Sequence, residues 1–216
     1  PIARSEALCA TTMQAINAYN KTDYKTQPTL WIEFHGSEAG VVEQAKLVEE
    51  IARENGGEGF EWSTRPEDRN RLWAARHQAY FAGLQLRKGS RAVSTDVCVP
   101  ISRLTECIVE TGKDIGNASM PIPLFGHVGD GNFHCMVLID PENEQDLDEA
   151  KAFNERLVKR ALDMEGTCTG EHGVGYGKRE WLIEEHGEAV DLMRTIKNAF
   201  DPENLMNPGK MLPPEQ

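Results

Sequence analysis

The stretch FGHVGDGNFH, residues 125–134, predicts a β-hairpin that carries one histidine on each strand. Asp130-Gly131 favours a two-residue turn, because a type I′ turn needs positive φ at both central positions. This turn, like a four-residue loop around it, places His127 opposite His134. Opposed residues share a face of the sheet, with Cβ atoms about 4.5–5.5 Å apart. The two imidazoles can therefore reach one metal ion at about 2.0–2.1 Å each.

The composition limits the class of protein. The chain has 216 residues, enough for one large or two small domains, and its 23 basic and 35 acidic side chains give a net charge of −12. This acidic balance argues against a general nucleic-acid or anionic-membrane surface. The sequence contains neither an apolar run of about 18 residues nor a signal peptide. Five cysteines without a C-x-x-C motif predict reduced thiols in an intracellular compartment.

Periodicity and turn residues predict alternating helices and strands, followed by a glycine-rich loop and a helical C-terminal segment. The expected helices cover residues 3–19, about 41–52, 64–86 (from a Thr64–Glu67 capping box with proline in the first turn), 104–115 and 147–161; the expected strands cover 29–35, 92–99 and a hairpin within 122–139. This order favours an α+β fold, an antiparallel sheet with helices on one face, over a parallel α/β sheet.

The loop GTCTGEHGVGYGK, residues 166–178, holds five glycines in thirteen positions, which predicts a backbone that closely approaches another group. It is not a phosphate loop: Walker A needs glycine where His172 stands and Ser or Thr where Arg179 stands. The dinucleotide fingerprint fails because its third glycine is missing and a helix precedes the loop. We therefore expect the loop to display Glu171 as a third metal ligand, with His172 as a general base beside it.

Simpler interpretations of the same residues stay open from the sequence alone. The two strand histidines can be structural or solvated, and Asp130 is explained by the turn. Arg76 and Tyr80 lie one helical turn apart, which is typical of an exposed pair unless that face lines the site. A metallohydrolase also fits the ligand set.

Four motifs in one order resemble the C-terminal half of the FAD-linked D-2-hydroxyacid dehydrogenases, within the vanillyl-alcohol-oxidase-like flavoproteins. They are STDVCVPISRL, GHVGDGNFH, GTCTGEHGVGYGKR and NLMNPGK, and the resemblance extends over essentially the whole chain, closest to the cytochrome-linked D-lactate type. It implies a ferredoxin-like substrate or cap domain (1–165). It also implies a segment (166–216), with the active-site loop and C-terminal helices, that packs toward an N-terminal FAD domain absent here.

The resemblance also implies roles for individual residues. His127, His134 and Glu171 match the family's ligands for a divalent metal, zinc or manganese. His172 matches the histidine that takes the proton from the substrate hydroxyl while the Cα hydride passes to the flavin. A metal ion that binds the hydroxyl lowers its pKa by Lewis-acid polarisation, which suits a neighbouring base.

Three further positions match the family's substrate or flavin contacts. Arg76 matches an arginine that anchors the substrate carboxylate with its fixed fork of donors, and Tyr80 matches a nearby pocket aromatic. Asn207 lies in a stretch, Asn207 to Lys210, that resembles the family's segment that packs back toward the flavin. Met136 stands where the related D-2-hydroxyglutarate enzymes have Asn, which indicates a smaller or more apolar 2-hydroxy acid.

The expected function is therefore part of a flavin-dependent oxidation of D-lactate or a similar small D-2-hydroxy acid. The fragment should be inactive without the FAD domain. Alternatives are a D-2-hydroxyglutarate dehydrogenase, a glycolate oxidase subunit, or a non-catalytic metal- or carboxylate-binding module. The expected electron acceptor is a cytochrome, a quinone or an electron-transfer flavoprotein, and the expected location is the bacterial cytoplasm or the mitochondrion. A homodimer is one option for the assembly.

Overall fold

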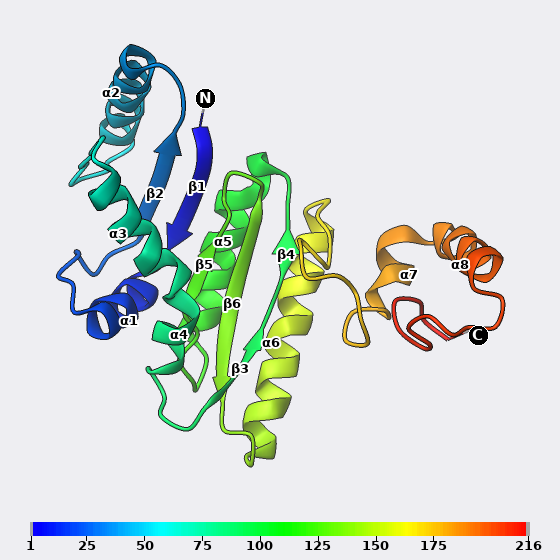
Figure 1. The fold of residues 1–216 in the computed structure, drawn as a ribbon. Coiled ribbons are helices and arrows are strands. Elements are labelled where there is room, and N and C mark those ends of the chain that lie inside the picture. The colour runs from blue at the N-terminus through cyan, green and yellow to red at the C-terminus, as the bar shows by residue number, and fades with distance from the viewer. Residues whose placement is uncertain (1, 215–216) are drawn as a thin grey trace.

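The computed structural model describes residues 2–214, which contain an antiparallel sheet. Its strands are β1 (Ile2–Leu8), β2 (Thr29–Phe34), β3 (Arg91–Ser94), β4 (Val97–Cys98), β5 (Leu124–Gly126) and β6 (Asn132–Ile139). They lie in the order β2-β1-β5-β6-β3, with β4 also paired to β6, and every pairing is antiparallel (Figure 1). The predicted α+β class with an antiparallel sheet is confirmed.

Eight helices of the described residues accompany the sheet. They are α1 (Ala10–Asn20), α2 (Glu38–Glu54), α3 (Pro66–His77), α4 (Ala79–Leu84), α5 (Ile101–Gly116), α6 (Glu144–Asp163), α7 (Trp181–His186) and α8 (Ala189–Phe200). α7 and α8 lie beside each other at one side of the sheet, in orange and red in Figure 1. Within residues 2–214, no helix combines the length and the apolar character that a membrane span requires.

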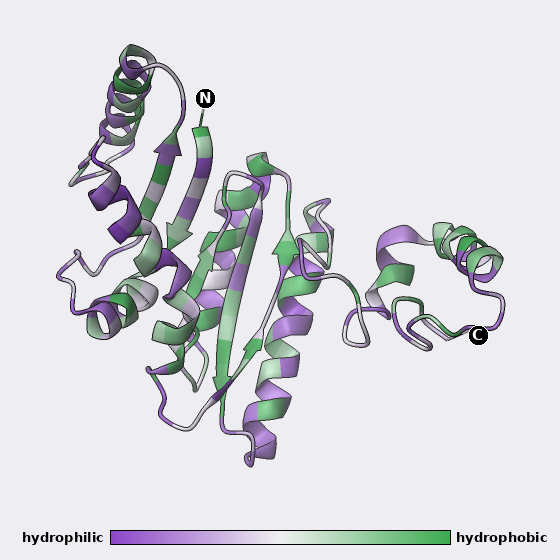
Figure 2. Cartoon of the chain, in the orientation of Figure 1, coloured by the Kyte–Doolittle hydropathy of each residue, from purple (hydrophilic) through white to green (hydrophobic). Residues whose placement is uncertain are grey.

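The core is organised around β6, whose eight residues are all buried. Phe133, Cys135 and Val137 point into a cluster with α5 and α6, whereas Met136 and Leu138 point into a second cluster with α1, α3 and α4. Side chains alternate between the faces of a strand, so β6 needs an apolar layer on each side. Helices therefore cover both faces of β6, whereas the sequence predicted helices on one face of the sheet only. Figure 2 shows the apolar colouring along β6 and the alternation along α6.

The predicted helix over residues 3–19 is wrong in its first half. Residues Ile2–Leu8 form β1, which lies between β2 and β5, and the helix begins only at Ala10. Glu6 and Leu8 are buried on alternate positions, as a half-covered strand requires. Pairing with two strands therefore overrides the helical preference of Ala, Glu and Leu, which is a weak local term.

Two other predicted elements are divided in the structure. The helix expected over 64–86 becomes α3 and α4, which meet at Gln78, and Arg65 rather than Thr64 stands at its N-cap without a side-chain bond. The strand expected over 92–99 is interrupted between β3 and β4. The interruption contains Thr95 and Asp96, both buried, and their polar groups face the site described next.

Candidate active site

The hairpin between β5 and β6 brings the two histidines to one face of the sheet, with a register that differs from the prediction. Phe125, not His127, lies opposite His134. A turn closes the loop, in which Asp130 N–H donates to the His127 carbonyl at 3.0 Å and Gly131 has a φ of 80°. The register differs by two residues, so the face is preserved, since side chains alternate with a period of two. The imidazole centroids lie 5.8 Å apart.

Glu171 completes a three-residue cluster with these histidines. Its Oε1 atom lies 3.0 Å from His134 Nε2 and 3.5 Å from His127 Nε2. One ligand atom from each residue fits within 4.8 Å of the other two. A tetrahedral ion with bonds of about 2.0–2.1 Å needs ligand atoms roughly 3.3 Å apart. The donor set and its spacing therefore fit a divalent metal ion.

Acceptors behind both rings hold the Nε2 atoms toward Glu171. His127 Nδ1 lies 2.6 Å from Glu6 Oε1, and His134 Nδ1 lies 3.2 Å from the Thr95 carbonyl. A metal-binding histidine commonly donates its other ring N–H to such an acceptor, which fixes the tautomer. Burial lowers the pKa of His134 below its ordinary value, which favours the neutral ring that can offer a lone pair.

His172 lies next to this cluster but is not one of its three residues. Its ring stacks on His134, with centroids 5.0 Å apart and planes 11° apart, and its Nε2 atom lies 3.6 Å from Glu171 Oε1. Asp96, His134 and His172 form a second grouping with metal-ligand spacing. The Asp96 oxygens, however, already accept hydrogen bonds from neighbouring groups. Asp96 is therefore less available to a metal ion than Glu171 is.

Asp96 is the buried anchor of the loop, with 1% of its surface exposed. Its carboxylate accepts the backbone N–H groups of Glu171 and His172 at 3.1 and 2.9 Å. It also accepts Asn132 Nδ2 at 2.9 Å and Lys178 Nζ at 3.0 Å. Burial by itself would raise the pKa of Asp96, but these hydrogen bonds and the Lys178 charge hold that pKa well below its usual range.

The close backbone approach expected of the glycine-rich loop is present at Gly170. A Cβ atom at this position would lie 1.8 Å from Asn132 Nδ2 and 2.8 Å from Asp96 Oδ1. Gly173, two residues beyond Glu171, has a φ of 74°, which L side chains rarely adopt. The loop thus needs glycine where it crosses the hairpin.

The other residues predicted for substrate and flavin contacts take different places. Arg76 is buried, with Nε and Nη2 at 3.0 and 2.8 Å from Glu6 Oε2, so it is not half of an exposed pair. Glu6 in turn contacts His127 of the cluster. Tyr80 is exposed, and its ring packs edge-on against Phe81. Asn207 accepts the Lys210 backbone N–H within the C-terminal segment. The predicted roles of these residues stay proposals.

Comparison with known proteins gives the family. Residues 1–211 match the family described as "FAD linked oxidases, C-terminal domain". The chain belongs to this family. The chain is 51% identical to the "Probable D-lactate dehydrogenase, mitochondrial" of Danio rerio, over 98% of this chain and 43% of that protein. It is 42% identical to the "D-lactate dehydrogenase [cytochrome], mitochondrial" of Arabidopsis thaliana, over 99% of this chain and 38% of that protein.

A solved structure supports the fold of this FAD-linked oxidase domain. The 4-ethylphenol oxidase of Gulosibacter chungangensis, in its isoeugenol complex, superposes with a TM-score of 0.67 at 16% identity, over 97% of this chain and 47% of that one. The chain spans less than half the length of all three proteins. The resemblance drawn from the motifs is thus confirmed at the level of the family.

Sequence reasoning missed two buried carboxylates of this FAD-linked oxidase domain. Glu6 was assigned to a helix, although its place two residues before Leu8 fits a strand. Asp96 lies in the run STDVCV, where an acidic residue between β-branched residues signals a polar group held inside a sheet. Both residues bind groups of the cluster rather than solvent.

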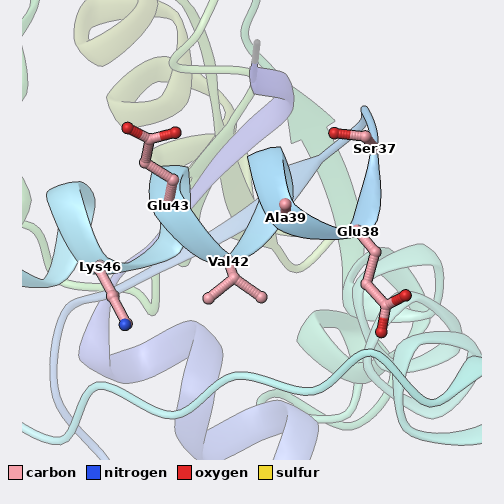
Figure 3. Close-up of a pocket in the computed structure, with 6 residues that line it drawn as sticks. All are labelled: Ser37, Glu38, Ala39, Val42, Glu43 and Lys46. Carbon is pink, nitrogen blue, oxygen red and sulfur yellow. The ribbon is translucent and has the colours of Figure 1, made fainter.

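A surface depression of about 780 Å³ lies apart from the cluster. It lies along the first turns of α2, and Figure 3 shows Glu38, Val42 and Lys46 around it. None of the residues that line it is a predicted site residue. The depression is therefore separate from the side chains at the hairpin and the loop.

Proposed function

We propose that this chain is the C-terminal part of a flavin-dependent dehydrogenase that oxidises D-lactate, or a similar small D-2-hydroxy acid, to the 2-oxo acid. The observation that carries the proposal is the convergence of His127, His134 and Glu171. His172 stacks on His134, and Glu6 links Arg76 to His127. The names of the Danio rerio and Arabidopsis thaliana relatives support D-lactate as the substrate.

The residues divide the chemical work among them. When bound, a divalent ion would supply Lewis-acid polarisation of the substrate hydroxyl, and FAD would supply the hydride acceptor. Arg76 contacts Glu6 through Nε and Nη2, so its Nη1 group can orient the substrate carboxylate. His172 accepts the hydroxyl proton at Nε2, beside Glu171. Zinc and manganese both remain candidates for the ion.

The flavin site is proposed to lie in the part of the relatives' length that this chain does not span. Leu192, Ile196 and Phe200 recur on α8 at a spacing of four residues and are all exposed. Such an apolar stripe on a helix normally packs against another element. We therefore assign residues 166–216 to the interface with the FAD-binding part, which includes the segment around Asn207. Tyr80 is assigned to the substrate pocket.

The names of the relatives also bear on partners and location. The word "cytochrome" in the name of the Arabidopsis thaliana protein favours a cytochrome over a quinone or an electron-transfer flavoprotein as the acceptor. Both relatives are named as mitochondrial, which favours that location over a bacterial cytoplasm.

Elemental analysis tests the metal site. The full-length protein should contain about one equivalent of zinc or manganese, and His134→Ala should lose it. His35→Ala is the matched control, because His35 is exposed and pairs with Glu33 on β2. The proposal also requires the full-length protein to oxidise D-lactate more efficiently than D-2-hydroxyglutarate or glycolate. A metal-free wild-type protein, or a preference for either competing acid, would contradict it.

A further inference from the structure

We propose that Glu6 is a positioning residue that couples the substrate anchor Arg76 to the metal ligand His127. The inference rests on the proposed function and extends it to a residue that touches neither metal nor substrate. One buried carboxylate would thus set the geometry of two different binding groups at once.

The geometry begins with the register of β1. Ala7 pairs with Gly126 and Leu8 with Phe125, so the same register places Glu6 beside His127. Each carboxylate oxygen of Glu6 has its own partner: Oε1 lies 2.6 Å from His127 Nδ1, and Oε2 lies 2.8 Å from Arg76 Nη2. Glu6 is buried, so water competes weakly for either contact.

The contact with His127 selects one form of the imidazole. The Glu6 carboxylate is paired with the Arg76 guanidinium and accepts hydrogen bonds, so its 2.6 Å contact favours the Nδ1–H tautomer of His127, whose Nε2 offers its lone pair toward Glu171. The two histidines differ in how much support they need. The His134 side chain is 7% exposed and is held by its surroundings, whereas the His127 side chain is 37% exposed. The charge-assisted contact therefore supports the ligand that burial supports least.

The contact with Arg76 fixes the direction of the substrate anchor. The Nε edge of the guanidinium faces Glu6, and its carbon lies 4.9 Å from the centre of the Phe125 ring. These two contacts restrain the plane of the guanidinium and direct Nη1 away from Glu6. Loss of the carboxylate would leave a buried cation without its partner, which favours a change of rotamer.

The test compares Glu6→Gln with Glu33→Gln in the full-length flavoprotein. Glu33 is a matched control: it is also buried, on the neighbouring strand, and it pairs with Arg4 at 2.6 Å. We measure zinc affinity by chelator competition, and KM and kcat for D-lactate. Glu6→Gln should weaken zinc binding by about 10–100-fold and raise KM, as expected for a residue behind a metal ligand. Glu33→Gln should change neither quantity, although both variants lose stability.

The outcomes separate this inference from the proposed function. A wild-type protein that binds no zinc or manganese overturns both. A wild-type protein that binds zinc, with Glu6→Gln equal to it in zinc affinity and KM, overturns the role of Glu6 alone. If Glu6→Gln does not fold, the ¹⁵N spectrum of the metal-free wild-type protein decides, because it identifies the tautomer of the neutral His127 ring. The Nδ1–H tautomer of His127 supports the inference, and the Nε2–H tautomer overturns it.

Discussion

Asp96→Asn should release the loop that carries Glu171 and His172. Asn has nearly the same shape as Asp, but one carboxylate oxygen becomes an amide NH₂ group. At the Oδ2 position this group would face the N–H groups of Glu171 and His172 and the Lys178 ammonium. The amide oxygen must therefore take that position, and the NH₂ group then faces Asn132 Nδ2, a donor 2.9 Å away. Every arrangement loses at least one hydrogen bond and the negative charge.

The size of the effect follows from these contacts. Removing one partner of a buried ion pair costs about 3–5 kcal/mol. The Lys178 side chain is 14% exposed, so water partly replaces its partner, and the lower end of that range applies. The two backbone hydrogen bonds remain but become neutral, which weakens each of them. We expect a loss of about 3 kcal/mol, equivalent to roughly a 100-fold larger open population of the loop.

Native-state hydrogen exchange measures this population. The amides of Glu171 and His172 should exchange about 100-fold faster in Asp96→Asn, because exchange reports local opening. Asp114→Asn is the control: Asp114 also forms ion pairs, with Arg156 and Arg160, but on α5 and α6. It should leave both loop amides protected. Unchanged exchange of Glu171 and His172 in Asp96→Asn would refute the view that Asp96 anchors the loop.

Three further predictions concern other contacts. Gly170→Ala should abolish metal retention, because its Cβ atom would lie 1.8 Å from Asn132 Nδ2. A Cβ atom at Gly177 meets open space, so Gly177→Ala should retain the metal as the wild type does. Elemental analysis of the two variants makes this comparison. His172→Gln should lower kcat of the full-length enzyme by about 10²–10⁴-fold with unchanged metal content, and loss of the metal would contradict the assigned base. Burial raises the pKa of Asp114, but its arginine partners outweigh this and lower it, so the pair stabilises the fold fully above about pH 4. Its contribution should fall as the pH drops below that value and be absent in Asp114→Asn, as acid unfolding curves will show.

Local sequence patterns predicted the parts of this structure that depend on near neighbours. The hairpin follows from Asp130-Gly131 between two apolar runs, and the shared face of His127 and His134 follows from the period of a strand. The register was wrong because the loop uses one turn followed by Gly131 in the left-handed region, a choice that Asp-Gly alone does not determine. Because side chains alternate with a period of two, a register shift of two residues still leaves both histidines on one face of the sheet.

The contacts that organise the site depend on distant parts of the chain. Glu6 and His127 are 121 positions apart, and Asp96 and Glu171 are 75 positions apart. No periodicity within either segment encodes such a contact. The helix predicted over residues 3–19 shows the consequence, because the partners that make Ile2–Leu8 a strand lie in β2 and β5. Only the strand order reveals that Glu6 faces the hairpin.

The side chains of the site differ in solvent exposure: Asp96 and His134 form its enclosed base, and Glu171 and His172 form its open rim. Asp96 and the His134 side chain are almost fully enclosed, whereas the side chains of Glu171 and His172 are 48% and 51% exposed. An enclosed base with an open rim is consistent with a site that another part of a polypeptide completes. The open rim fits the proposal that the FAD-binding part covers it, because exclusion of water would strengthen the charge interactions of Glu171 and His172. The buried anchors would meanwhile keep the ligand geometry fixed, so covering the rim needs no rearrangement of the base.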